Sequence, residues 1–155
     1  MMISTKGRYA VRVMIELAVH ETEACIPLEE IARHQEISKK YLEAIVKRLV
    51  RAGLVIGLRG KGGGYRLART PDTYTVAEIL REAEGPLVPV ACLEPGAKAC
   101  QRAETCATLP MWRQLMELTE AYLKSVTLQD LAQQALKNGE KDGLDAVWEH
   151  CGSCQ

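Results

Sequence analysis

The fold is decided by residues 37–69, ISKKYLEAIVKRLVRAGLVIGLRGKGGGYRLAR. Their first part predicts a helix, because Ser38 is a good N-cap, apolar residues recur every three or four positions, and Gly53 can end the helix as its C-cap. The second part predicts a β-hairpin, since two short apolar runs at 54–58 and 65–68 flank a glycine-rich tip. The apolar stripe of the helix comprises Tyr41, Leu42, Ile45, Val46, Leu49 and Val50.

Helical periodicity extends from this stretch in both directions. Toward the N-terminus it predicts a helix over about residues 6–21 and a short helix at 28–35. Toward the C-terminus, Thr75 and Glu78 form a plausible capping box for a further helix. The order helix, short helix, turn, helix, hairpin is that of a winged helix-turn-helix. The expected fold class is therefore mainly α, with a small β-hairpin wing.

The C-terminal half divides at its prolines and cysteines. A longer helix is expected after Pro110, and Thr127 with Asp130 predicts the start of another. The residues before Pro110 contain little periodic pattern. We therefore divide the chain into a winged helix-turn-helix domain at 1–85, a cysteine-containing loop at 86–110, long helices at 111–137 and a flexible tail at 138–155.

Length and composition limit the class of protein. A chain of 155 residues suits one domain with a small extension, and 47% hydrophobic with 26% charged residues excludes a mainly disordered chain. No apolar run approaches the roughly 20 residues of a membrane-spanning helix, and the start lacks the features of a signal peptide. We expect a soluble, cytoplasmic protein with no membrane partner.

The net charge of zero conceals a division between the two halves. Residues 1–70 carry 13 Lys and Arg against 7 Asp and Glu, a net charge of +6, whereas residues 71–155 carry 7 against 13, a net charge of −6. A basic N-terminal half favours a polyanionic partner, and the acidic half indicates a different task. The alternative is that these charges only solvate the surface.

The side of the predicted helix opposite its stripe fits a helix that enters the DNA major groove. Lysines there can neutralise phosphates, Ser38 can bond a phosphate or a base, and Glu43 can accept a hydrogen bond from a cytosine amino group. The glycines of the tip allow Arg59, with Lys61 nearby, to approach a narrow minor groove. A winged helix used for protein contacts is the alternative. The polar side comprises Ser38, Lys39, Lys40, Glu43, Ala44 and Lys47.

Cysteines are numerous, with six in the chain. In a reducing compartment, clustered cysteines indicate metal or redox chemistry rather than structural disulfides. Cys92, Cys100 and Cys106 lie in an irregular loop that could wrap around a metal centre. Structural zinc sites usually contain close CxxC pairs and four ligands, so an iron–sulfur site completed by a ligand from elsewhere is favoured. A role as a small buried hydrophobe suits Cys25 better than the three loop cysteines.

The fourth ligand stays open. The candidates are Cys151, Cys154, His150, Glu104 or a group from a partner subunit. The CxxC of the tail could equally form a reversible disulfide or belong to a disordered end.

A thiol-dependent enzyme is a distant alternative. Such an enzyme needs a cysteine beside a histidine and an orienting acid. His20, His34 and His150 lie on predicted helices or in the tail, and no catalytic signature surrounds any cysteine. We expect histidines at helix ends to be surface residues and the chain not to be an enzyme.

Four segments together resemble the IscR-like, Rrf-type family of bacterial winged-helix iron–sulfur transcriptional regulators. They are STKGRYAVRVMIELA at 4–18, ISKKYLEAIVKRLVRAGLV at 37–55, RGKGGGYRLAR at 59–69 and the three-cysteine loop ending in CATLPMW at 106–112. The resemblance implies a homodimer paired through the long helix after Pro110. It also implies a repressor whose affinity for a palindromic operator in double-stranded DNA is set by the state of an iron–sulfur cluster.

The resemblance also assigns site residues. Cys92, Cys100 and Cys106 would be the cluster ligands, with 2Fe–2S favoured over 4Fe–4S. Some members of the family have no cluster and regulate cysteine metabolism through a partner enzyme, which is the alternative function. The DNA contacts that the resemblance implies are Ser38, Tyr41, Glu43, Arg59 and Gly60.

Two positions depart from the family pattern. Members with a 2Fe–2S cluster often have a histidine three positions after the last cysteine, where this chain has Leu109. Nitric oxide-sensing relatives with a 4Fe–4S cluster use an aspartate near the N-terminus, where this chain has Arg8. The cluster type and the fourth ligand therefore stay open.

Overall fold

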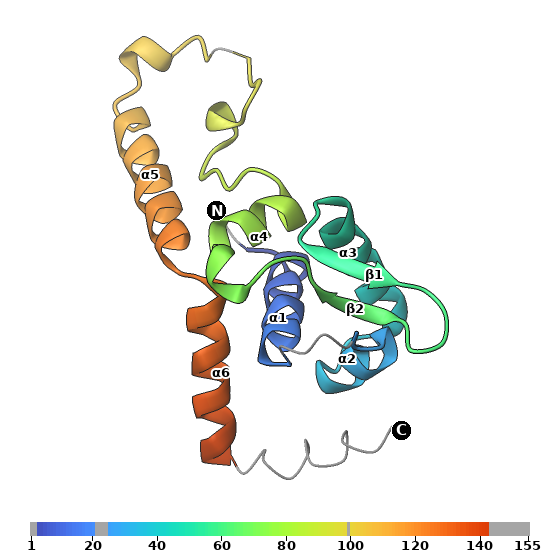
Figure 1. The fold of residues 1–155 in the computed structure, drawn as a ribbon. Coiled ribbons are helices and arrows are strands. Elements are labelled where there is room, and N and C mark those ends of the chain that lie inside the picture. Colours follow the sequence, from blue (N-terminus) through green and yellow to red (C-terminus); the bar gives the residue numbers. More distant parts are fainter. Residues whose placement is uncertain (1–2, 21–24, 99, 143–155) are drawn as a thin grey trace.

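Helices dominate the protein, and one hairpin projects from them (Figure 1). A computed structural model describes residues 3–20, 25–98 and 100–142. The predicted fold class, mainly α with a β-hairpin wing and a long C-terminal helix, is confirmed. The helices are α1 (Thr5–Val19), α2 (Leu28–His34), α3 (Lys39–Arg51), α4 (Val76–Glu84), α5 (Leu109–Ser125) and α6 (Leu128–Asp142), and the strands are β1 (Val55–Leu58) and β2 (Gly64–Leu67).

The N-terminus of α3 is set by the predicted cap. Ser38 has an extended backbone, and its hydroxyl accepts from the Tyr41 N–H at 3.4 Å. At the other end the helix stops at Arg51, with Ala52 and not Gly53 as its C-cap. Gly53 follows with a φ of 72°, a left-handed conformation that favours glycine and turns the chain into β1.

The wing is an antiparallel pair in which Val55 lies opposite Leu67 and Leu58 opposite Gly64. One further residue, Ile26, joins it by an antiparallel bridge. The Ile26 N–H donates to the Tyr65 carbonyl at 2.9 Å, and the Tyr65 N–H donates to the Ile26 carbonyl at 2.8 Å. The segment before α2 is therefore joined to the wing by two backbone hydrogen bonds, a connection that no local sequence pattern indicates.

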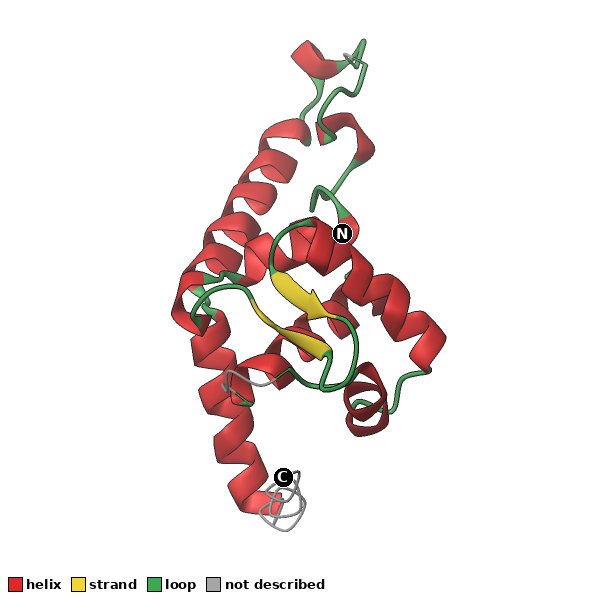
Figure 2. Cartoon of the chain, turned by 45° about the vertical axis from the view of Figure 1, so that its right-hand side comes forward, coloured by secondary structure: helices red, strands yellow, loops and turns green. Residues whose placement is uncertain are grey.

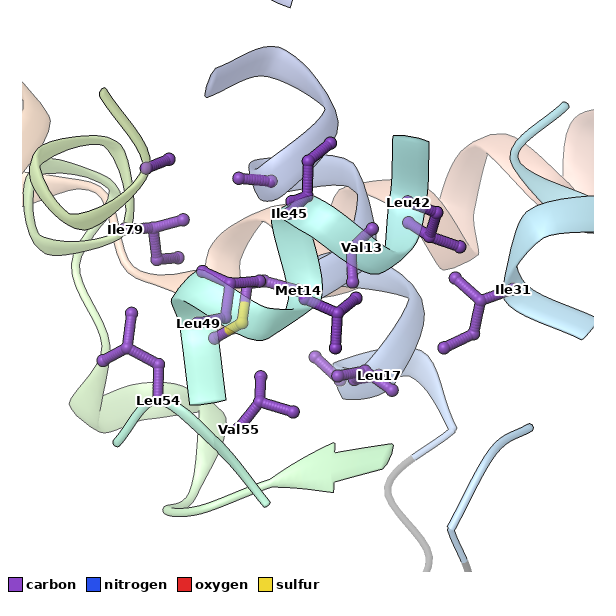
Figure 3. Packing of buried hydrophobic residues seen from close by; sticks show 14 of the residues in the cluster. Val13, Met14, Leu17, Ile31, Leu42, Ile45, Leu49, Leu54, Val55 and Ile79 are labelled. Atoms are coloured by element: carbon purple, nitrogen blue, oxygen red, sulfur yellow. The ribbon is translucent and has the colours of Figure 1, made fainter. Parts of the chain in front are cut away.

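The core lies where α1, α3 and α4 meet (Figure 3). Val13 and Met14 of α1 and Leu42 of α3 are fully buried within it. The predicted stripe of α3 is correct in its centre and wrong at two positions, because the side chains of Tyr41 and Val50 are 39% and 37% exposed. The stripe is therefore narrower than its periodicity suggests.

The two C-terminal helices occupy different surroundings. α6 lies beside α1, and its Leu128 and Ala132 are buried in the same core (Figure 1). α5, by contrast, has no buried residue. It runs along one side of the body toward the 86–108 segment (Figure 2). The helices expected at 111–137 are thus divided between a core helix and an exposed one.

The bounds of the cysteine loop and of the two C-terminal helices differ from the predicted bounds. α5 begins at Leu109, with proline in its first turn, and the expected loop at 86–110 contains two short 3₁₀ turns, at Ala91–Leu93 and Ala103–Thr105. α6 continues to Asp142, into the range expected to be a tail. The tail cysteines and His150 lie outside the described residues. None of the described helices combines the length and apolarity that crossing a membrane demands.

Candidate nucleic-acid interface and cysteine loop

The exposed side of α3 is strongly basic. The helix carries five Lys or Arg residues and one Glu. Ser38, Lys39, Lys40 and Lys47 are exposed, and Glu43 is half-buried. Because the apolar side packs into the core, this basic side faces outward.

Two lysines of α3 are held in ion pairs. The Lys39 Nζ lies 3.4 Å from a carboxylate oxygen of Glu29 on α2, and the Lys47 Nζ lies 2.9 Å from Glu43, one turn away. The hydrogen bond from Lys47 lowers the pKa of the Glu43 carboxyl below its ordinary value. Glu43 is therefore an ionised acceptor already oriented on the face that was predicted to read bases. Within the described residues, Lys40 has no ion-pair partner.

Tyr41 is positioned by α1. Its ring makes an edge-to-face contact with Tyr9 at a centroid distance of 5.9 Å, and the Arg12 guanidinium lies 5.3 Å from the Tyr9 ring centroid. Such contacts hold an aromatic ring in one orientation. Tyr41 was predicted both as a core residue and as a DNA contact. It is exposed at the surface, and its ring is held in place by Tyr9.

The tip of the wing presents Arg59 and Lys61, both exposed. Gly60 between them has a φ of 96°, which a side chain would disfavour. A groove of about 610 Å³ separates the wing from α3, with Lys39 and Lys47 on one wall and Arg59 on the other. Three of the predicted DNA contacts, Lys39 and Lys47 of α3 and Arg59 of the wing, therefore face a common, positively charged groove.

A polar network that the sequence analysis missed supports the helix-turn-helix from behind. The Arg12 guanidinium donates to the side chain of Gln35 at 2.8 Å and to its backbone carbonyl at 2.9 Å. The Gln35 amide donates to Glu16 at 2.6 Å, and His34 Nδ1 lies 2.8 Å from Glu16. Arg12 and Glu16 are one turn apart on α1, so the network ties that helix to the turn between α2 and α3. The spacing of Arg12 and Glu16, one helical turn apart, is the sequence signal that could have indicated this network.

Glu16 is the centre of this network. It is 7% exposed, and burial by itself raises the pKa of its carboxyl. The nearby His20 and the hydrogen bonds from His34 and Gln35 outweigh the burial, so the pKa of the Glu16 carboxyl lies below its ordinary value. His20 and His34 stack with their rings 21° from parallel and a centroid distance of 6.5 Å. The expectation that these histidines are surface residues is wrong, because both are half-buried against Glu16.

The three loop cysteines lie between α4 and α5, in a segment that arches away from the wing (Figure 1). Cys92 and Cys100 are exposed and Cys106 is half-buried, all three as free thiols. The Cys106 Sγ lies 3.5 Å from the Thr108 hydroxyl, and this hydrogen bond lowers the pKa of the Cys106 thiol. Across the described part of the chain, the cysteines are not among the groups of three ligand atoms close enough to share one ion.

The base of the loop packs on both neighbouring helices. A cavity of about 300 Å³ lies between α4, α5 and the start of the loop, with Leu87, Leu93 and Met116 among its walls. The Arg81 guanidinium of α4 bonds the Glu120 carboxylate of α5 at 2.7 Å beside it. The loop is therefore adjacent to the contact that links the exposed helix to the core.

Comparisons with known proteins agree with this architecture. The family model Rrf2, described as an iron-dependent transcriptional regulator, matches residues 3–134. The HTH-type transcriptional regulator IscR of Xenorhabdus nematophila is 38% identical over 147 residues, which are 94% of this chain and 88% of that protein. CymR, the global cysteine regulator of B. subtilis, has a solved structure with a TM-score of 0.70 and 40% identity, covering 86% of this chain and 98% of that one. The structure of T. potens IscR gives a TM-score of 0.69 and 36% identity, covering 87% and 88%.

Proposed function

The chain belongs to the Rrf2 family of transcriptional regulators, and from that premise we propose that it is a homodimeric, cytoplasmic repressor of palindromic operators in double-stranded DNA. In this proposal an iron–sulfur cluster on the cysteine loop sets the affinity of the protein for its operators. Membership of a family of regulators also confirms the prediction that the chain is not an enzyme. The observation that carries the DNA-binding part is the basic groove between α3 and the wing.

In this proposal α3 enters the major groove of DNA. Lys39, Lys40 and Lys47 neutralise phosphates, Ser38 and Tyr41 contact the backbone or bases at the start of the helix, and Glu43 accepts from a cytosine amino group. Lys47 would move from Glu43 to a phosphate, which frees the carboxylate for the base. Arg59, Gly60 and Lys61 follow the minor groove.

The dimer is proposed to form through α5. Met111, Leu115, Leu118 and Tyr122 are all more than 40% exposed, and their spacing of four, three and four residues aligns them along one side of the helix. An apolar stripe on a helix is buried when a second copy pairs with it. Pairing would set the distance between two α3 helices, which must match major grooves about 34 Å apart or a multiple of that distance.

The donor set of the loop suits the proposed cluster. Cys92, Cys100 and Cys106 supply thiol groups, the usual ligands of iron–sulfur clusters, on irregular backbone that can rearrange around a metal centre. When bound, the cluster would supply a redox-sensitive and oxygen-sensitive centre. The three thiols would hold it, and a fourth ligand would come from Glu104, the residues beyond 142 or the partner subunit.

A cluster-free regulator is the second candidate. It is favoured by the separation of the three thiols, by the lowered pKa of the Cys106 thiol and by the 40% identity to a cysteine regulator. In this version the thiols respond to oxidation, or a partner protein supplies the signal.

DNA binding is tested by titrating the protein onto operator DNA from its own promoter region at several salt concentrations. Lys40→Ala should weaken binding to all sequences and reduce the salt slope by about 1. Lys137→Ala, which removes an exposed lysine of α6, is the matched control. Glu43→Ala should instead relax base preference. Unchanged salt slopes for Lys40→Ala, or unchanged preference for Glu43→Ala, would refute the role assigned to that residue.

The cluster is tested by an anaerobic absorbance spectrum with iron and sulfide analysis on freshly purified protein. Visible charge-transfer bands that are lost in Cys106→Ala and kept in Cys25→Ala would support a cluster on the loop. A colourless protein without iron, even after reconstitution, would refute the cluster and leave the second candidate.

A further inference from the structure

Two histidines and a buried glutamate converge behind the helix-turn-helix, away from the cysteine loop. His20 Nε2 lies 3.6 Å and His34 Nδ1 lies 2.8 Å from the same oxygen of Glu16, Oε1. One potential ligand atom from each residue lies within 4.8 Å of the other two. Glu16 lies on α1, His20 is the C-cap residue that follows this helix, and His34 is the last residue of α2.

The second oxygen of the carboxylate is already occupied. Glu16 Oε2 accepts from the Gln35 amide at 2.6 Å, and Arg12 in turn bonds Gln35 at 2.8 Å. These bonds fix the orientation of the carboxylate and leave Oε1 between the two imidazoles. Hydrogen bonds of this kind from surrounding residues orient the ligands of protein metal sites.

We propose that Glu16, His20 and His34 form a binding site for one divalent transition metal ion of the zinc class. Two imidazoles and one carboxylate suit the nitrogen and oxygen preference of Zn²⁺ and leave a coordination position for water. Bonds of about 2.1 Å bring neighbouring ligands of a tetrahedral ion to about 3.4 Å from one another. The two ligand atoms that lie farthest apart, within 4.8 Å of each other, must therefore approach by up to about 1.4 Å, which rotation of the half-buried histidines can supply.

Metal binding requires one change of protonation. In the structure His34 Nδ1 donates to the ionised Glu16 carboxylate, and its Nε2 faces the Arg33 guanidinium at 3.4 Å. With the metal on Nδ1, the proton moves to Nε2 and Arg33, which is exposed, turns away. The carboxylate then exchanges a hydrogen bond for a metal bond.

Such an ion would connect the end of α1 with the end of α2, which among the described residues contact each other here through side chains. Two of its ligands belong to α1 and its C-cap, and the third, His34, lies beside the turn that precedes α3. The metal would therefore fix the orientation of the helix-turn-helix against the core. This site is independent of the cluster, since it shares no residue with the cysteine loop.

The test is equilibrium dialysis of the full-length protein, with its cysteines in place, against Zn²⁺. His34→Gln and His20→Gln should each retain one equivalent less zinc than the wild type. Glu82→Gln, which removes an exposed carboxylate of α4 away from both sites, is the control and should retain the wild-type amount. Equal zinc in all four proteins would overturn the proposal.

Two further readouts separate a metal ligand from a residue that only supports the fold. Zn²⁺ should raise the Tm of the wild type more than that of His34→Gln, whereas a purely structural role lowers the Tm of the variant equally with and without zinc. With Co²⁺, the wild-type spectrum minus that of His34→Gln should contain visible ligand-field bands and no thiolate charge-transfer band. A thiolate band in that difference would assign the lost ion to cysteines and refute the site. None of these measurements involves DNA or iron, so their failure is distinguishable from failure of the proposed function.

Discussion

Tyr74→Phe tests how the wing is fastened to the core. Tyr74 is fully buried, and its hydroxyl donates to the Leu54 carbonyl at 2.8 Å and accepts from the Arg69 N–H at 2.8 Å. These two residues flank the β-hairpin, so one hydroxyl closes its base. The substitution removes the oxygen and keeps the ring, which packs under the Arg69 guanidinium at 4.3 Å.

The expected loss in the free energy of unfolding depends on the two groups that lose the Tyr74 hydroxyl as a hydrogen-bond partner. The Leu54 carbonyl keeps the Ala68 N–H at 3.2 Å, whereas the Arg69 N–H, which is only part-buried, loses the Tyr74 acceptor. An orphaned buried donor costs about 1–3 kcal/mol. We therefore expect the free energy of unfolding to fall by about 1–2 kcal/mol.

Urea unfolding followed by circular dichroism measures this difference. Tyr41→Phe is the matched control, because that ring is 39% exposed, and we expect it to change the free energy of unfolding by less than about 0.5 kcal/mol. If Tyr74→Phe were no more costly than Tyr41→Phe, the hydroxyl would not hold the base of the wing. A loss above about 4 kcal/mol would equally contradict the reasoning, because it would require disruption of the core.

Three further predictions concern the other elements. Leu118→Asp, on the most exposed leucine of α5 at 62%, should halve the mass measured by sedimentation equilibrium, and an unchanged mass would exclude α5 from the dimer interface. Thr108→Val should slow the alkylation of Cys106 at about neutral pH, because losing the hydrogen bond raises the thiol pKa toward its ordinary value and reduces the thiolate fraction. Equal alkylation rates in the wild type and the variant would refute the role of this hydrogen bond. Gly64→Ala should lower the free energy of unfolding by about 1–3 kcal/mol in urea, since the added Cβ would overlap the Ile26 carbonyl, and an unchanged midpoint would contradict the close approach.

The fold was predictable because its signals are local. Ser38 and Thr75 cap α3 and α4 as their positions in the sequence suggested. The start of α6 is capped reciprocally, with the Thr127 hydroxyl accepting from the Asp130 N–H at 3.1 Å and the Asp130 carboxylate accepting from the Thr127 N–H at 2.9 Å. Such caps depend on residues three apart, which a sequence displays directly.

Contacts between segments that are distant along the chain could not be predicted from the sequence. Glu78 was expected to complete a capping box with Thr75, yet its carboxylate bonds Arg69 at 2.7 Å. Periodicity places Glu16 on α1 but gives no indication that the end of α2 brings His34 to it. The positions of the three cysteines relative to one another depend in the same way on how an irregular loop folds, which no local pattern determines.

The contacts around α4 suggest how a change in the cysteine loop would reach DNA. At the N-terminal end of α4, backbone bonds join the α5–α6 connection to the core: the Val76 N–H donates to Val126 at 3.0 Å, and the Leu128 N–H donates to Tyr74 at 3.0 Å. Farther along, α5 is held to α4 by the exposed Arg81–Glu120 pair, a type of contact that contributes only about 0–1 kcal/mol. If the cysteine loop became ordered, we therefore expect α5 to rotate about the connection at Val126, which the backbone bonds hold in place, rather than the core to be distorted. In a dimer paired through α5, that rotation changes the distance between the two α3 helices and hence the operators that they fit.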